Sequence, residues 1–368
     1  ATDADIKGLC VYVFNGTGTG AAFEAKSSTM TGTDQVLNIP VSAGDKSIVV
    51  VANDVDRTVA NLGALYALTK DYDESLGNFT MNSKTYEVTI APNVVNYLGY
   101  GSTGEAEGHY LTAAGTGAVN LYRNVAKISL SSLQVNTTTS ESSYSNAQLA
   151  VSSIFVLHGS KATKLVGGAA AWASTESAGD WLNGATNDEY AAWVTTIKNW
   201  IDAATDDQTR TPKHNYLEEK YAPYSATDNH IFTYTETLAD KVAAKTNITD
   251  FYTYENTNTT TRTLLVVAGK FTYGNLSAAD VQTRYYSVAI GEGVVFDTSA
   301  KPSGAEVERT AGVLRNVQYN VSLTVKGPGY ETPFGPDGGG DGGSGNTALD
   351  VKVQVVPFGQ VSQSEEIE

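Results

Sequence analysis

A glycine-rich stretch at residues 335–346 separates the body of the chain from a short C-terminal tail. This composition cannot bury a core and predicts flexible coil. In the tail, Leu349, Val351, Val353 and Val355 alternate with polar residues, which is the period of a half-buried strand. Such a strand needs a sheet edge for its backbone groups. If that edge belongs to another copy, the contact is head-to-tail and the assembly grows into a filament.

Length and charge restrict what the body can be. A chain of 368 residues favours two domains, each with its own core. Its net charge of -16 argues against a nucleic-acid partner, because too few cations are present to neutralise phosphates. The single cysteine, Cys10, excludes an internal disulfide framework and a cysteine-based zinc site. No run approaches the roughly 20 apolar residues of a membrane helix. We expect Ala1 to be a processed N-terminus.

Apolar and β-branched runs predict an all-β fold of sandwich type. The predicted strands cover residues 9–14, 35–41, 46–53, 84–90, 96–100, 119–130, 150–157, 230–234, 263–271, 284–290 and 316–326. Two segments have helical spacing instead, residues 57–70 and residues 188–203.

A loop rich in glycine and alanine, residues 101–117, predicts the domain boundary. We expect an N-terminal β-sandwich at 1–116, a C-terminal β-sandwich at 117–334, a glycine-rich linker at 335–347 and C-terminal strands at 348–368. The run at 119–130 is too long for one flat strand and is expected to bend between the domains.

Patterns that carry chemistry are scarce. The four histidines, His109, His158, His214 and His230, lie far apart without metal-ligand spacing, and no nucleophile elbow is present. The glycines at 16, 18 and 20 follow a strand but lack the lysine and the helix of a phosphate loop, which favours a hairpin turn. The sequence therefore predicts no catalytic residue, no metal site and no cofactor.

Short matches along the chain resemble the major fimbrial subunits, or fimbrillins, of Bacteroidales type V pili. Their order and spacing together carry the resemblance. The matches are residues 9–15, 43–45, 48–53, 96–100, 123–126, 251–256, 264–270, 314–316, 319, 327–329, 349–355 and 357–358.

The resemblance implies two tandem transthyretin-like β-sandwiches, made as a lipoprotein precursor. In that family a protease removes the precursor's first strand, and the C-terminal strand of the next subunit fills the groove that is left. Carried over, Ala1 is the new N-terminus and the groove is lined by Leu9, Val11 and Val13, or by the alternating set Cys10, Tyr12 and Phe14. The donor lies within residues 348–368, with Phe358, Val361 and Ile367 in its last part and Leu349, Val351, Val353 and Val355 before it.

The same resemblance implies a location and partners. We expect a structural protein of a cell-surface fimbrium anchored at the outer membrane, which supports adhesion and biofilm. The expected partners are identical subunits, anchor and tip subunits, and host or bacterial surface ligands, without nucleic acid.

Two features depart from the family pattern and leave alternatives open. Only Val361 and Ile367 give the last segment an apolar face, so a donor would depend mainly on backbone hydrogen bonds, and the glycine-rich stretch is longer than the family's usual connection. Pro357 interrupts the ladder, which fits a break between a strand kept in the subunit and a strand given to the next. One alternative is a monomeric adhesin or glycan-binding sandwich with Trp181, Trp193 or Trp200 as a sugar platform. The other is a secreted hydrolase on a β-sandwich.

Overall fold

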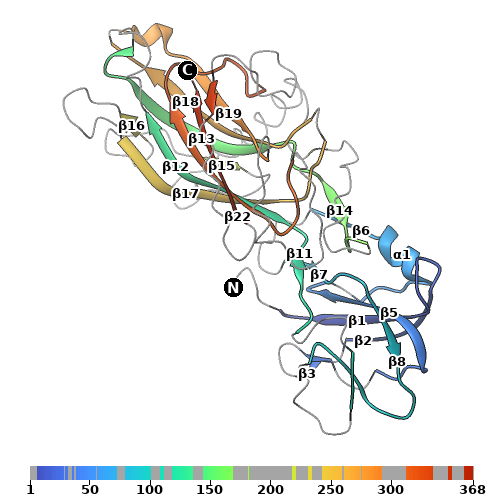
Figure 1. Ribbon diagram of the computed structural model, residues 1–368. Coiled ribbons are helices and arrows are strands. Elements are labelled where there is room, and N and C mark those ends of the chain that lie inside the picture. The colour runs from blue at the N-terminus through green and yellow to red at the C-terminus, as the bar shows by residue number, and fades with distance from the viewer. Residues whose placement is uncertain are drawn as a thin grey trace, which may run out of the picture. The chain divides into compact units, whose positions relative to one another are not determined.

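A computed structural model of the chain forms two compact units (Figure 1). Unit 1 comprises Ala1–Val125 and Ala162–Thr175, and unit 2 comprises Ala126–Lys161 and Glu176–Glu368. The structure describes residues 6–28, 30–31, 35–36, 39–54, 56–72, 79–100, 108–111, 118–135, 144–168, 181, 218–220, 231–233, 243–258, 261–274, 276–291, 312–334, 347–349 and 360–367. Nearly all described elements are strands, which confirms the predicted all-β fold class.

Unit 1 is built on one antiparallel sheet in the order β11-β7-β5-β1-β2, with β8 also paired to β5. Three two-stranded pairs accompany it, β3-β4, β9-β10 and β6-β14. The elements are β1 (Leu9–Asn15), β2 (Ala22–Ser27), β3 (Met30–Thr31), β4 (Gln35–Val36), β5 (Gly44–Ala52), α1 (Leu62–Ala67), β6 (Thr69–Asp71), β7 (Met81–Asn82), β8 (Tyr86–Ile90), β9 (Asn96–Leu98), β10 (His109–Leu111), β11 (Tyr122–Arg123) and β14 (Ala162–Lys164).

Strand β1 lies in the middle of this sheet, between β2 and β5. Its apolar run is continuous because both of its faces are buried. The strand ends at the turn predicted from Asn15 and Gly16. There Gly16 has a φ of 94°, which a residue with a Cβ rarely adopts, and its N–H donates to the Asp45 carbonyl at 2.8 Å.

The helix predicted at residues 57–70 is wrong at both ends. Helix α1 starts after Asn61, whose side chain accepts a hydrogen bond from the Ala64 N–H at 2.8 Å. It ends before Leu68, because Thr69–Asp71 continues as strand β6 and pairs with β14. The strand predicted at 35–41 is also shorter, since β4 ends at Val36 and residues 39–43 are irregular.

The predicted run at 119–130 forms two strands, β11 and β12, with a break at Asn124 and Val125. The chain passes from unit 1 to unit 2 at this break and later returns to unit 1 for residues 162–175.

Unit 2 contains two five-stranded sheets, β17-β12-β20-β22-β21 and β15-β13-β18-β19 with β16 paired to β13. The elements are β12 (Ala126–Val135), β13 (Gln148–Leu157), β15 (Glu218–Lys220), β16 (Ile231–Thr233), β17 (Ala243–Thr253), β18 (Leu264–Thr272), the 3-10 helix η4 (Ala278–Asp280), β19 (Thr283–Ala289), β20 (Gln318–Val325), β21 (Thr347–Leu349) and β22 (Gln360–Ile367). The helix predicted at 188–203 lies outside the described residues.

Candidate assembly surfaces

The side chains of β1 and β5 divide between two faces of the unit 1 sheet. Cys10, Tyr12, Phe14, Val49 and Val51 belong to one core cluster, and we call them the Tyr12 face. On the opposite side lie Leu9, Val11, Val13, Ile48 and Val50, which we call the Val11 face. The register supports this division, because Tyr12 pairs with Val49 and Val11 pairs with Val50.

The Tyr12 face is covered by segments of this chain. Leu62 and Leu65 of α1 pack on it, together with Leu165 and Val166 from the returning segment. Tyr12 is 1% exposed and Phe14 is 0% exposed. This side of the sheet is therefore a completed core.

Hydrogen bonds and ion pairs hold the edge of the Tyr12 face. The Tyr12 hydroxyl accepts a hydrogen bond from the Arg57 N–H at 3.0 Å, and the Arg57 guanidinium pairs with Asp54 at 3.0 Å. Lys70 also pairs with Asp54, at 3.2 Å. Burial raises the pKa of the Asp54 carboxyl, but hydrogen bonds and charges from Arg57 and Lys70 outweigh burial and lower it overall. Burial raises the pKa of the Cys10 thiol, which disfavours the reactive thiolate.

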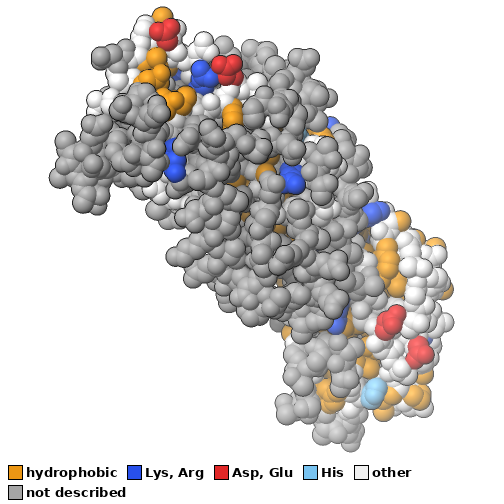
Figure 2. Space-filling model, turned by 45° about the horizontal axis from the view of Figure 1, so that its top comes forward, with side chains coloured by type: hydrophobic (Ala, Val, Ile, Leu, Met, Phe, Trp, Pro, Cys, Tyr) orange, Lys and Arg blue, Asp and Glu red, His pale blue; other side chains and the backbone are white. Residues whose placement is uncertain are grey.

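The Val11 face contacts other segments of the chain. Val13 and Ile48 pack in one cluster with Tyr86, Val88, Ile90 and Leu111. Leu9 and Val50 pack in another with Ala52 and Met81. Partly buried apolar side chains surround them: Ile6, Ala25, Ile39, Val41, Leu98, Val119 and Leu121, together with Val11 itself. Figure 2 shows hydrophobic side chains at the surface of the described part of unit 1, at the lower right of the view.

The three residues predicted to line an acceptor groove therefore share one face. Leu9 and Val13 are buried and Val11 is half-buried. The alternative set, Cys10, Tyr12 and Phe14, lies on the face that α1 covers. A role for either set in receiving a donor strand stays a prediction.

The C-terminal tail returns to the sheet of its own unit. Strand β22 pairs in parallel with β20 over eight register positions, from Gln360 with Gln318 to Ile367 with Val325. On its other side, β22 pairs antiparallel with β21. Of the predicted donor residues, Leu349 lies in β21, and Val361 and Ile367 lie in β22. Val351, Val353, Val355 and Phe358 lie outside the described residues.

A buried ion pair fixes the segment that leads into β20. Arg315 donates from Nε to both carboxylate oxygens of Glu255, at 3.0 and 2.9 Å, and both side chains are 1% exposed. Tyr319 adds two hydrogen bonds, because its hydroxyl accepts from the Leu314 N–H at 2.9 Å and donates to the Gly312 carbonyl at 3.1 Å. Strand β20, with which β22 pairs, is thus held at its start by buried polar contacts. Sequence patterns missed this pair, since its partners are 60 residues apart.

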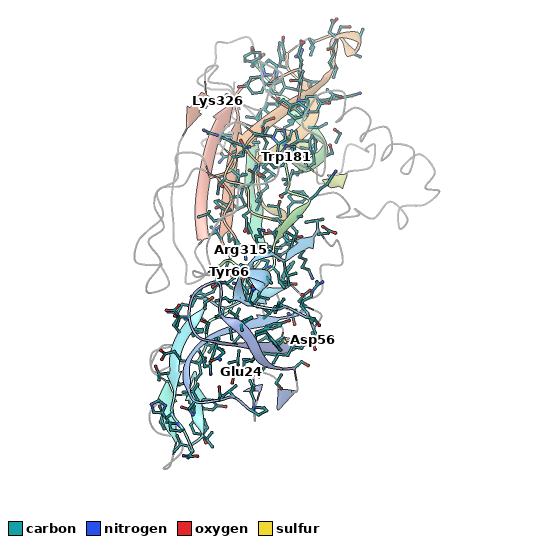
Figure 3. The ribbon with its side chains drawn as sticks, turned by 90° about the vertical axis from the view of Figure 1, so that its right-hand side faces the viewer. Glu24, Asp56, Tyr66, Trp181, Arg315 and Lys326 are labelled. Atoms are coloured by element: carbon teal, nitrogen blue, oxygen red, sulfur yellow. The ribbon has the colours of Figure 1, made fainter. Side chains whose placement is uncertain are left out.

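The proposed sugar platform is not formed by Trp181. This side chain is 7% exposed, and its ring lies 5.6 Å from that of His158 in unit 2, where Figure 3 labels it. His158 is itself buried and stacks on Phe334. Trp193 and Trp200 lie outside the described residues.

In the described part of the chain, no group of three or more His, Cys, Asp or Glu side chains is arranged to hold a metal ion. No helix in the same residues is long and apolar enough to cross a membrane.

Comparison with known proteins gives one family match and two curated relatives. Residues 1–131 match the family model of the major fimbrial subunit protein FimA. Two curated relatives from Porphyromonas gingivalis, major fimbrium subunit FimA type-2 and type-3, are each 25% identical to this chain, and each alignment covers 91% of this chain and 80% of the relative.

Solved structures share the fold over the whole chain. A fimbrilin from Porphyromonas gingivalis W83 has a TM-score of 0.57 at 19% identity, covering 100% of this chain and 92% of that one. A protein from Parabacteroides distasonis, described as a candidate cell adhesion protein, has a TM-score of 0.57 at 21% identity, covering 100% of this chain and 95% of that one. The resemblance to the Bacteroidales fimbrillins that the sequence predicted is therefore confirmed, by the family match in residues 1–131 and by relatives aligned over most of the chain.

Proposed function

We propose that this chain is a structural subunit of a cell-surface fimbrium that polymerises head-to-tail. Strand β22 of one subunit leaves its own sheet and packs over the Val11 face of the next, where its backbone pairs with an edge strand. The observation that carries this proposal is the parallel ladder of β22 with β20, because a strand that follows the glycine-rich stretch at 335–346 has the reach to pair with another sheet edge. The fimbrial relatives support the same role.

The donor strand β22 is suited to exchanging its backbone hydrogen bonds with β20 for bonds with another subunit. Register places Gln363 beside Val321 and Glu365 beside Leu323, two buried positions of β20. The ladder in the subunit's own sheet consists of backbone bonds worth about 0.5–1.5 kcal/mol each. An equivalent ladder in a neighbour replaces these bonds, and any apolar surface buried in addition favours the exchanged state.

The acceptor surface, which is the Val11 face, is suited to a donor strand with few apolar residues. The Val11 face already has buried residues at its centre and half-buried residues around them. A donor that covers this margin removes apolar surface from water at about 25 cal/mol per Å². Val361 and Ile367 supply apolar contacts, and the backbone of β22 supplies the ladder.

The remaining parts of the proposal follow the fimbrial family. A lipoprotein precursor loses its first strand by proteolysis, and the filament is anchored at the outer membrane. Identical subunits, an anchor subunit and a tip subunit are the partners, and adhesion and biofilm are the biological outcome. No catalytic step and no cofactor is part of this role.

Electron microscopy and an unboiled SDS gel test the proposal on the chain beginning at Ala1. The full chain is expected to form filaments and a high-mass ladder, and a chain ending at Val356 is expected to form neither. Monomers from both chains that bind a glycan array would replace the fimbrial role with that of an adhesin.

A complementation experiment separates donor from acceptor. Val11→Glu places a charge on the Val11 face and leaves β22 intact, whereas the chain ending at Val356 keeps the face and lacks β22. Each alone is expected to remain monomeric, and their mixture is expected to give dimers without filaments. Glu87→Lys, on the exposed side of β8, is the matched charge control and is expected to polymerise normally. Filaments from Val11→Glu alone would contradict the assigned acceptor face.

A further inference from the structure

A fully buried lysine lies at one end of the Val11 face. Lys46 of β5 is the register partner of Asn15, the last residue of β1, and its side chain is 0% exposed. Its Nζ donates to Asn15 Oδ1 at 2.7 Å and to Ser42 Oγ at 2.9 Å. The same Nζ lies 2.9 Å from Glu24 Oε2. An amine, a carboxamide and a carboxylate from three adjacent strands therefore meet at hydrogen-bonding distance.

A β-bulge brings Glu24 to this position. The β1–β2 register pairs Val13 with Ala25 and Phe14 with Phe23, so Glu24 is the extra residue without a register partner. Bulges re-aim the side chain of the extra residue, and they are common beside active sites. The other Glu24 oxygen, Oε1, accepts a hydrogen bond from the Ser42 N–H at 2.6 Å. Figure 3 labels Glu24 among the strands of unit 1.

The carboxyl group of Glu24 is held in its ionised form. Burial raises its pKa, but the hydrogen bonds from Ser42 and Lys46 outweigh burial and hold the pKa below its usual value. Glu24 is therefore a carboxylate at neutral pH. A lysine amine becomes a nucleophile when an adjacent base removes its proton in a desolvated site.

We propose that Lys46, Asn15 and Glu24 form a self-processing centre that joins β5 to β1 through an isopeptide bond. Glu24 takes a proton from the Lys46 ammonium, and the free amine attacks the amide carbon Cγ of Asn15. A bond forms between Nζ and Cγ, and the bond from Cγ to the Asn15 amide nitrogen breaks. One Nζ proton stays on the new amide, and the other two pass through Glu24 to the leaving nitrogen, which departs as ammonium. Glu24 ends as a carboxylate, and no oxidant, metal or cofactor takes part.

The geometry is close to that needed for attack. Asn15 Cγ lies at most about 1.2 Å further from Nζ than Oδ1 does, because that is the length of the carbonyl bond. Reacting atoms in a near-attack arrangement are about 3–3.5 Å apart, so a small rotation of the amide brings Cγ into range. Asn15 itself is exposed, which gives the departing ammonium a route to water. This inference concerns bonds within one chain and does not rest on the proposed polymerisation.

Intact-mass spectrometry of the purified, folded full chain tests the proposal. The chain is expected to be lighter than its sequence by one ammonia molecule. Tryptic digestion is expected to leave the bond after Lys46 uncut and to give two peptides joined through Lys46 and Asn15. Lys46→Arg is expected to have the full mass. Glu24→Gln keeps the size of the side chain but removes the base, and it is expected to form the link about a hundredfold more slowly or worse.

Lys26→Arg is the matched control. Lys26 lies on β2 and pairs with Asp56, but its hydrogen bond goes to a backbone carbonyl rather than to an amide side chain. This variant is expected to keep the mass deficit. Circular dichroism checks that each variant is folded, and Glu24→Gln decides the matter if Lys46→Arg does not fold.

Two results would overturn the proposal. One is a folded chain with the full mass of its sequence. The other is a mass deficit that persists in Lys46→Arg, since an asparagine followed by glycine can also lose ammonia by closing onto the Gly16 backbone nitrogen. Only a deficit that depends on Lys46 and yields the joined peptides supports the isopeptide bond.

Discussion

The Tyr12 face and the Val11 face belong to the same two strands, yet they are completed in different ways. Helix α1 and the returning segment with Leu165 and Val166 cover the first. Strand β8, together with Leu111 and Met81, contacts the second, and both faces have half-buried apolar side chains around their buried residues. A continuous apolar run predicts that both faces of a strand are buried, but it does not say what buries them. The two faces therefore differ in which segments of the chain complete them.

The largest expected effect is on the Tyr12 face. Phe14→Ala removes a fully buried ring that meets Phe23 edge-on at 6.2 Å. The resulting cavity is expected to lower the free energy of unfolding by about 3–5 kcal/mol. Urea denaturation followed by tryptophan fluorescence or circular dichroism measures it. A loss below about 1 kcal/mol would mean that this face is not a packed core.

The ion pairs at the edge of the same face give a pH-dependent effect. Asp54→Asn is expected to lower the free energy of unfolding by about 1.5–3 kcal/mol at neutral pH, since it weakens charged hydrogen bonds to Arg57 and Lys70. The folded state lowers the pKa of Asp54, so this contribution is present above the ordinary carboxyl pKa of 3.8 and disappears as pH falls through the lower folded value. The gap between variant and parent is therefore expected to narrow in strong acid. A gap that is constant from neutral pH into strong acid would exclude the charge as its source.

Two neighbouring valines compare the faces directly. Val49 lies on the Tyr12 face and Val50 on the Val11 face, and both lose the same two methyl groups in Val→Ala. We expect Val49→Ala to cost about 2 kcal/mol and Val50→Ala about 1 kcal/mol, because Val50 is 7% exposed and Val49 only 1%. Chemical denaturation of the unpolymerised chain measures both. Equal losses would remove the energetic distinction between the faces.

The smallest effect is expected outside both faces. Val95 is 60% exposed in the turn before β9, so Val95→Thr should change the free energy of unfolding by less than about 0.5 kcal/mol. The same denaturation experiment provides the measurement, and this variant is its baseline. A larger loss would show that Val95 has contacts in solution that its exposure does not indicate.

Sequence patterns predicted the strands with strong apolar signals. Runs that became β1, β5, β13, β18 and β20 were identified with small errors at their ends. Strand β17 was missed because its first residues, Ala243 to Asp250, lack an apolar period, and only pairing with β12 makes them a strand. The helix around α1 was overextended because the spacing of its apolar residues continues past Leu68, where pairing with β14 takes over.

The candidate surfaces were predictable only in part. Alternation in β1 correctly separated Leu9, Val11 and Val13 from Cys10, Tyr12 and Phe14, but left open which set a helix covers. That choice depends on Leu165 and Val166, more than 100 residues away, which no local pattern connects to β1. The approach of Glu24 to Lys46 and Asn15 depends on a bulge between β1 and β2, which shifts the register by one residue and leaves no mark in the alternation.

The returning segment also sets an order of events during synthesis. Unit 1 loses part of its core and its β6–β14 pair if the chain stops at Val125, because Leu165 and Val166 have not yet been made. A ribosome therefore releases strands β12 and β13 of unit 2 before unit 1 can close. The N-terminal unit cannot fold to completion as an independent first domain, and its maturation waits for the synthesis of part of the second.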